Sequence, residues 1–271
     1  MIVMTKTPMA DLQKEAGVSL AKHGLHADGK GGIKVRLVLD HSWSMKNWYA
    51  AGAVQRLTEQ VLGLASKLDD DGIIEVWYFG SGVSEVYQVS LNRASLTQNM
   101  PVTGAAAPAR RRGLFGRRIP ASAPGAPVLD PYYVGWVNRS HVLEPWGSTN
   151  YPAGLRAPVD FARAEGDEDP ALVIFQTDGG PDDRDAANAT LRAVSGEDTF
   201  FAFVVFGDED ETGPHSAATY MKGLDNLSGR TRDNASVLFT GGLDRFATLP
   251  DSAVYDGVLK EFVGQWLPQV L

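Results

Sequence analysis

Residues 33–44 read IKVRLVLDHSWS, and this stretch decides the fold. Residues 33–39 carry apolar side chains on both faces, which predicts a central parallel strand covered by helices on either side. The strand runs directly into Asp40, which is followed by Ser42 and Ser44. Because ligands of open α/β sheets bind at the carboxyl ends of the strands, these three oxygen-bearing side chains are candidates for a binding site.

The rest of the chain continues the alternation of strands and helices. Further strands are predicted at 73–79, 83–91, 171–175, 199–206 and 236–239, and helices at 11–25, 47–68, 152–164, 182–194, 215–227 and 252–270. The short link Gly80-Ser81-Gly82 joins two of these strands, which predicts an antiparallel hairpin. We therefore predict an α/β fold: a doubly wound, mostly parallel six-stranded sheet with one antiparallel edge strand and helices on both faces.

Composition divides the chain into three parts. Residues 1–32 are predicted to form an N-terminal helical extension and linker, and residues 33–271 the α/β domain. Within that domain, residues 101–128 are dominated by Pro, Ala, Gly and Arg without any periodicity, which predicts a mobile insertion.

Two other segments can complete a site with Asp40. The strand at 171–175 leads into Asp178 and a Gly/Pro turn, and the polar turn at 147–151 supplies Thr149. Carboxylate and hydroxyl oxygens suit Mg²⁺ or Mn²⁺ and suit zinc or copper poorly. Considered singly, the two aspartates or the serines could instead be N-caps of helices.

The five residues together resemble the metal-ion-dependent adhesion site of von Willebrand factor A (vWA) domains. That pattern is Asp-x-Ser-x-Ser, then a loop threonine, then an aspartate before glycine, and it is matched by Asp40, Ser42, Ser44, Thr149 and Asp178. The resemblance implies a vWA fold from about residue 33 onward, with Mg²⁺ held by these side chains. Residues 16–25 also resemble bacterial vWA proteins of tellurium-resistance and stress-response loci.

The resemblance implies a binding function rather than an enzyme. A metal with an open coordination position captures an Asp or Glu side chain of a protein partner, so the expected cofactor is Mg²⁺ or Mn²⁺. Two alternatives remain: a metal-dependent hydrolase or phosphotransferase, for which the sequence nominates no general base, and a structural interaction module whose metal site does not function.

Residues near the predicted ligands are candidates for contact with the partner. They are His41, Trp43, Asn150 and Tyr151. His41 and Trp43 also depart from the small or aliphatic residues usual in the adhesion-site pattern. Five arginines of the insertion have three interpretations: a solvated loop, a contact with an anionic surface, or a gate over the acidic segment 208–211. They are Arg110, Arg111, Arg112, Arg117 and Arg118.

Composition excludes several other classes of function. The 271 residues include no cysteine and only five histidines, which removes disulfides, thiolate metal sites and cysteine nucleophiles. The formal net charge of −8 disfavours a nucleic-acid partner. No apolar run approaches the length of a membrane span and the first residues lack a signal-peptide pattern, so we expect a cytoplasmic protein.

Overall fold

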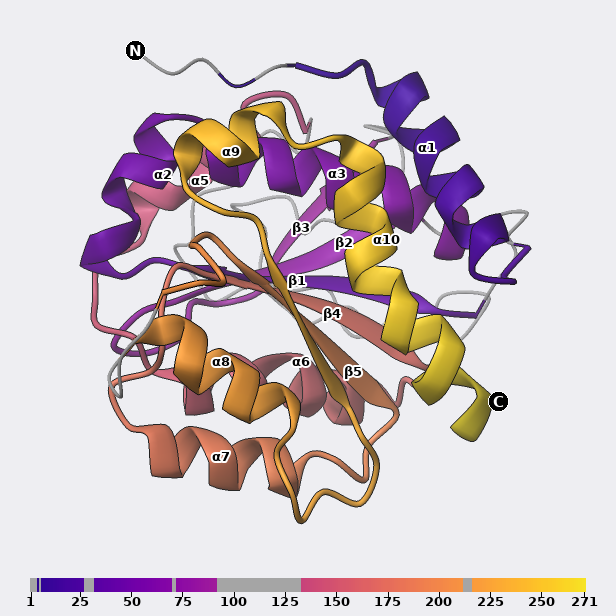
Figure 1. Ribbon diagram of the computed structural model, residues 1–271, viewed down its shortest axis with the longest axis vertical. Coiled ribbons are helices and arrows are strands. Elements are labelled where there is room, and N and C mark those ends of the chain that lie inside the picture. The colour runs from indigo at the N-terminus through magenta and orange to yellow at the C-terminus, as the bar shows by residue number, and fades with distance from the viewer. Residues whose placement is uncertain (1–3, 5, 27–31, 70–71, 92–132, 212–215) are drawn as a thin grey trace, which may run out of the picture.

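Six strands form one sheet in the order β3-β2-β1-β4-β5-β6 (Figure 1). They are β1 (Lys34–Asp40), β2 (Ile73–Phe79), β3 (Tyr87–Ser90), β4 (Ala171–Thr177), β5 (Thr199–Val205) and β6 (Ala235–Phe239). The computed structural model describes residues 4, 6–26, 32–69, 72–91, 133–211 and 216–271. All neighbouring strands pair in parallel except β3, which runs antiparallel to β2 at the edge. The predicted fold class is confirmed.

Helices cover both faces of the sheet because its central strands are buried on both sides. One face packs against α1 (Met9–Lys22), α3 (Ala53–Leu68) and α10 (Asp251–Glu261), and the other against α6 (Tyr151–Glu165), α7 (Arg184–Ala193) and α8 (Ala217–Asp225) (Figure 1). Alternation along β1 sends Leu37 and Leu39 into the first core and Val38 into the second.

Shorter helices surround the carboxyl ends of the strands. They include a 3₁₀ turn at Trp43–Met45, α2 (Lys46–Ala50), α5 (Trp136–Ser140), a 3₁₀ turn at His141–Leu143 and α9 (Leu243–Thr248). The single helix predicted at 47–68 is wrong, because Gly52 adopts a left-handed conformation (φ 79°) and separates α2 from α3. After α10 the chain continues through a π-helical turn (Phe262–Trp266) and a 3₁₀ turn (Leu267–Gln269).

The N-terminal helix packs on the domain rather than standing away from it. α1 lies against α3 and α10, and its residues Leu12, Ala16 and Leu20 are buried. No helix within the described ranges is long and apolar enough to cross a membrane.

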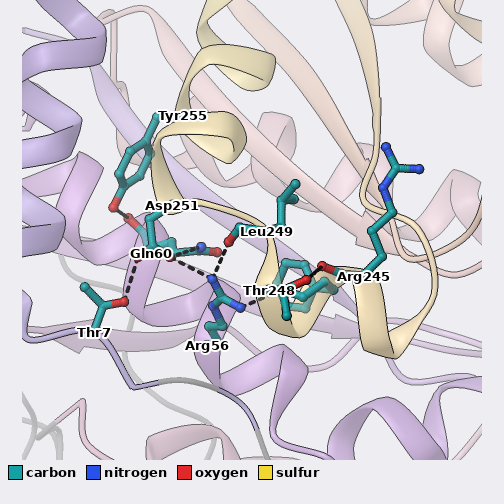
Figure 2. Close-up of polar contacts among 9 residues, drawn as sticks. Thr7, Arg56, Gln60, Arg245, Thr248, Leu249, Asp251 and Tyr255 are labelled. Atoms are coloured by element: carbon teal, nitrogen blue, oxygen red, sulfur yellow. Dashed lines mark hydrogen bonds and ion pairs between the residues drawn. The ribbon is translucent and has the colours of Figure 1, made fainter. Parts of the chain in front are cut away.

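A buried polar network fastens α10 to α3 (Figure 2). Arg56 of α3 donates hydrogen bonds to the carbonyl oxygens of Phe246 and Leu249 and to Asp251 Oδ1. The hydroxyl of Thr7, just before α1, donates to Asp251 Oδ2 at 2.6 Å. This network satisfies backbone carbonyls at the end of α9. It connects three segments that are distant in sequence: the residues before α1, α3, and the start of α10.

Candidate metal centre

Asp40, the last residue of β1, has a fully buried and fixed carboxylate. Its Oδ1 accepts a hydrogen bond from the Ser42 backbone N–H at 2.8 Å, and its Oδ2 accepts one from Thr177 Oγ1 at 2.7 Å. The Tyr49 hydroxyl donates to the Asp40 carbonyl oxygen at 2.9 Å. Both the backbone and the side chain of Asp40 are therefore held in one orientation.

A chain of hydrogen bonds leads from the same turn to the neighbouring strand. Ser42 Oγ lies 3.0 Å from Ser44 Oγ, and Ser44 Oγ donates to Asp178 Oδ1 at 2.9 Å. Asp178 directly follows β4, which pairs with β1, so the two strands deliver their carboxylates to the same edge of the sheet. The structure thus brings together four of the five predicted ligands: Asp40, Ser42, Ser44 and Asp178.

Thr149, the fifth predicted ligand, is placed by its loop. Gly147 exchanges backbone hydrogen bonds with residues 41 and 43, and the Asn150 N–H donates to the Gly80 carbonyl oxygen at 3.0 Å. The Thr149 N–H donates to Asp182 Oδ2 at 2.9 Å. These contacts hold the loop between the ends of β1, β2 and β4. Thr149 is half-buried, and Gly147, two residues before it, pairs with Ser42 in the turn that follows β1.

The electrostatics of this edge are unfavourable without a cation. Burial, and then the nearby Asp178 carboxylate, raise the pKa of Asp40 to about 7, although hydrogen bonds from Ser42 and Thr177 oppose the rise. Burial also raises the pKa of Asp178. Two facing carboxylates that resist ionisation are stabilised by a positive charge placed between them.

The donor set fits a hard divalent cation. Two carboxylates and three hydroxyls are ligands that Mg²⁺ and Mn²⁺ accept, with water completing the coordination. Within the described parts of the chain, no three His, Cys, Asp or Glu side chains gather into a metal cluster. A cation at this edge would therefore depend on the serine and threonine hydroxyls as well as on the two aspartates.

Two residues predicted to contact a partner are buried, and that prediction is wrong for them. His41 is 1% exposed, because the residue after Asp40 points to the opposite face of β1, where it stacks on Trp146 with the ring centroids 3.8 Å apart. Tyr151 is 0% exposed, and its hydroxyl donates to the Gly179 carbonyl oxygen and to Thr177. Trp43, in contrast, is 61% exposed.

The alternative that the aspartates or serines are helix caps finds no support in the hydrogen bonds. Asp183 caps α7 by accepting from the Ala186 N–H, and the side chain of Asn150 caps α6. Ser42 stands at the N-cap position of the 3₁₀ turn without a side-chain capping bond. Asn150 also donates from Nδ2 to the Ser81 carbonyl oxygen at 3.1 Å, so this predicted partner contact has two structural roles.

Sequence reasoning missed three residues that shape the site. Thr177 donates to Asp40, Asp182 holds the Thr149 loop, and Gly147 approaches the Gly80–Ser81 backbone so closely that a Cβ there would lie 2.3 Å from Ser81 N. The position of Thr177 beside Asp178 at a strand end was a usable signal. The roles of Asp182 and Gly147 depend on contacts between loops far apart in the chain.

The predicted arginine gate cannot be compared with the structure. Arg110, Arg111, Arg112, Arg117 and Arg118, and the insertion 101–128 that contains them, lie outside the described residues. The acidic segment 208–211 is exposed after β5 and contributes an ion pair between Glu209 and Lys222 at 3.5 Å.

The sheet order, the antiparallel edge strand and the helices on both faces define a vWA-type α/β domain. A family model described as vWA-TerF-like, the vWA domain found in the C terminus of TerF, matches residues 32–270. The chain therefore belongs to the vWA-TerF-like family.

One protein of known sequence and two of known structure illustrate the similarity. YcbR of Bacillus subtilis (strain 168) is 25% identical over 258 residues, which cover 93% of this chain and 84% of YcbR. Proximal thread matrix protein 1 from the mussel byssus is 15% identical, with a TM-score of 0.47. The match covers 84% of this chain and 48% of the mussel protein, so this chain spans about half the length of the mussel protein. The manganese-loaded TRAP protein of Plasmodium vivax is also 15% identical, with a TM-score of 0.43 over 84% of this chain and 74% of that one.

Proposed function

We propose that this vWA domain is a divalent-metal-dependent protein-interaction module. Asp40, Ser42, Ser44, Thr149 and Asp178 would hold Mg²⁺ or Mn²⁺ at the carboxyl edge of the sheet. The observation that carries the proposal is the continuous hydrogen-bonded set from the buried Asp40 through Ser42 and Ser44 to Asp178. When bound, the cation supplies a coordination position that an Asp or Glu of a protein partner can fill.

The chain's own residues prepare this site before a cation arrives. Thr177 and the Ser42 N–H orient the Asp40 carboxylate, and Ser44 orients Asp178. Preorganisation of this kind lowers the cost of ordering ligands when a cation binds. It also supports recognition of an acidic partner by a protein whose formal charge is −8, because a bound cation offsets the local negative potential.

We propose a binding role rather than catalysis. A hydrolase would need a general base beside the cation, within about 3 Å of the water to be activated. His41, the histidine next to Asp40 in sequence, is buried with its Nδ1 3.1 Å from the Pro145 carbonyl oxygen and its ring on Trp146. This orientation supports a packing role for His41. The proposal of a binding role is tested by assays of phosphoester turnover with Mg²⁺ or Mn²⁺. A turnover rate that depends on Asp178 would overturn it.

The test of metal binding is titration calorimetry with Mg²⁺ and Mn²⁺. We expect millimolar or tighter binding by the wild type and none by Asp178→Ala. Asp185→Ala is the matched control, since it removes the same charge from an exposed position in the first turn of α7, at the same end of the sheet. Binding that survives in Asp178→Ala, or no binding in any of the three proteins, would overturn the proposal.

We further propose that the module works in the cytoplasm, in a bacterial tellurium-resistance or stress-response complex. The support is the family model, which takes its name from TerF, and the resemblance of residues 16–25 to such proteins. Deletion of the gene should sensitise its host to tellurite, and the wild type but not Asp178→Ala should restore growth. Equal growth of the deletion strain and its parent would contradict this assignment.

A further inference from the structure

An open surface pocket of about 580 Å³ lies beside the turn that carries Ser42 and Ser44. Its lining consists of Lys46, Tyr49, Ala50, Asn138, His141 and Trp146. Two chain segments connect it with the candidate metal centre: Lys46 follows Ser44 by two residues, and Trp146 precedes Gly147, which bridges to Ser42. Figure 1 shows α2 and α5, which contribute lining residues, near each other beside the end of β1.

Three of the six residues that line this aromatic pocket carry rings, and these rings pack against one another and against His41. Trp146 stacks on the buried His41, and Tyr49 meets Trp146 edge-on with the ring centroids 5.4 Å apart. His141 lies 4.8 Å from Tyr49, centroid to centroid. Because Tyr49 is itself fixed by its hydrogen bond to the Asp40 carbonyl oxygen, the pocket and the candidate metal centre share one rigid support.

Lys46 adds a positive charge at the same place. Its Nζ lies 3.7 Å from the centroid of the Trp43 ring and 5.6 Å from that of Trp146. The ammonium group therefore lies between the exposed Trp43 and the pocket wall. It is placed to attract an acidic segment and to lie over the face of an additional aromatic ring.

Four exposed apolar side chains lie on segments at this end of the sheet. Trp43 is 61%, Val83 41%, Val142 65% and Leu143 42% exposed, whereas the described residues outside this region include only Val18 and Leu271 among large exposed hydrophobics. Val83 follows β2, and Val142 and Leu143 adjoin His141 of the pocket lining. Exposed apolar side chains next to an aromatic pocket suit a surface that binds another protein.

We propose that the aromatic pocket receives an aromatic side chain of the partner segment whose Asp or Glu occupies the candidate metal centre. The recognised segment would then be acidic, with a Phe, Tyr or Trp close to the captured carboxylate. The ring-lined walls and Lys46 favour an aromatic guest over an aliphatic one, because edge-to-face and cation–π contacts add to apolar burial. This inference rests on the proposed function of the metal centre.

The experiment is an array of synthetic peptides, each with a central Asp or Glu and with the flanking positions varied over all residue types. Binding of the purified protein is quantified with Mg²⁺ or Mn²⁺ and again with EDTA. We expect binding that requires the metal and is about tenfold stronger for peptides with an aromatic residue near the acid.

Two tryptophan substitutions on α2 separate the pocket from the metal centre. Ala50→Trp fills the pocket from its exposed rim and removes no existing side-chain contact, so acid binding should remain while the aromatic preference is lost. Asn47→Trp is the matched control, on an exposed position of the same helix outside the lining, and should retain the preference. Trp146→Ala, which opens the wall, should lose the preference as Ala50→Trp does.

The outcomes distinguish the two proposals. Metal-dependent binding of acidic peptides without an aromatic preference would overturn the pocket assignment and leave the metal function standing. Aromatic binding that persists in EDTA, or a preference unchanged in Ala50→Trp, would also overturn it. The absence of metal-dependent binding to every acidic peptide would overturn the proposed function and the pocket assignment together.

Discussion

The affinity of the candidate centre for Mg²⁺ should fall about tenfold as the pH is lowered from 8 to 6. The pKa of Asp40 is about 7 in the metal-free protein, raised first by burial and then by Asp178. This carboxyl is then about nine-tenths ionised at pH 8 and about one-tenth at pH 6. Because Mg²⁺ binds the ionised carboxylate, the tenfold decrease in the ionised fraction of Asp40 lowers the apparent affinity about tenfold. The free energy of Mg²⁺ binding is then less favourable by about 1.4 kcal/mol at pH 6 than at pH 8.

Calorimetry at both pH values, in two buffers of different ionisation enthalpy, measures this linkage directly. The difference between the buffers reports the protons released per Mg²⁺ bound, which should be about one at pH 6 and about 0.1 at pH 8. Asp185→Ala should reproduce the wild-type profile. Asp178→Asn should bind more weakly, and its pH dependence should be flatter because it removes the second of the two effects, after burial, that raise the pKa of Asp40.

An affinity that stays constant between pH 6 and pH 8 would refute this reasoning. So would Mg²⁺ binding at pH 6 with no proton release. Either result would mean that Asp40 is already ionised in the metal-free protein, or that the cation binds without this carboxylate.

The other predictions concern the fold and the loops around the site. Arg56→Ala should lower the free energy of unfolding by about 3–5 kcal/mol in urea denaturation, because it removes the cationic partner of the buried Asp251 carboxylate and the donor to two carbonyl oxygens. A loss below about 1 kcal/mol would contradict this. Gly147→Ala should weaken Mg²⁺ binding about tenfold or more in calorimetry, because the added Cβ would lie 2.3 Å from Ser81 N. Gly82→Ala is the control and should bind Mg²⁺ as the wild type does, because the space around its Cβ is open. Equal Mg²⁺ affinities of the two variants would contradict the prediction. Burial lowers the pKa of His41 to about 4, so the folded protein binds fewer protons there than the unfolded chain, and stability should fall by on the order of 3 kcal/mol as the pH drops from about 6.5 to 4. Urea denaturation of His41→Phe should lack this component, and an identical pH slope in both proteins would contradict the assignment.

The sequence alone was sufficient for the class of fold and for nominating the candidate ligand set. The mainly apolar runs of β1, β2, β4 and β5 predict strands buried on both faces, and parallel strands deliver their last residues to one edge. Asp40, Ser42 and Ser44 share one turn, so their proximity is a local property of the chain. Asp178 joins them because its strand ends at the same edge of the sheet.

Some details were within reach of the sequence but were not drawn from it. The two-residue period of a strand puts His41 on the face opposite Asp40, which is the reason it packs into the aromatic cluster instead of facing a partner. The break at Gly52 is different in kind. Glycine permits a positive φ without requiring it, so the apolar periodicity of 47–68 could not reveal that the helix is interrupted there.

Only the tertiary structure determined how the ligands are supported and what lies beside them. Thr177 donates to Asp40, Asp182 holds the Thr149 loop, and Trp146 stacks on His41, across separations of 33 to 137 residues. Local propensity and periodicity act over a few residues and carry no information on which distant loops meet. That information arises when strands pair and side chains pack to a single arrangement, and it is this arrangement that turns a short Asp-x-Ser-x-Ser turn into a preorganised candidate site.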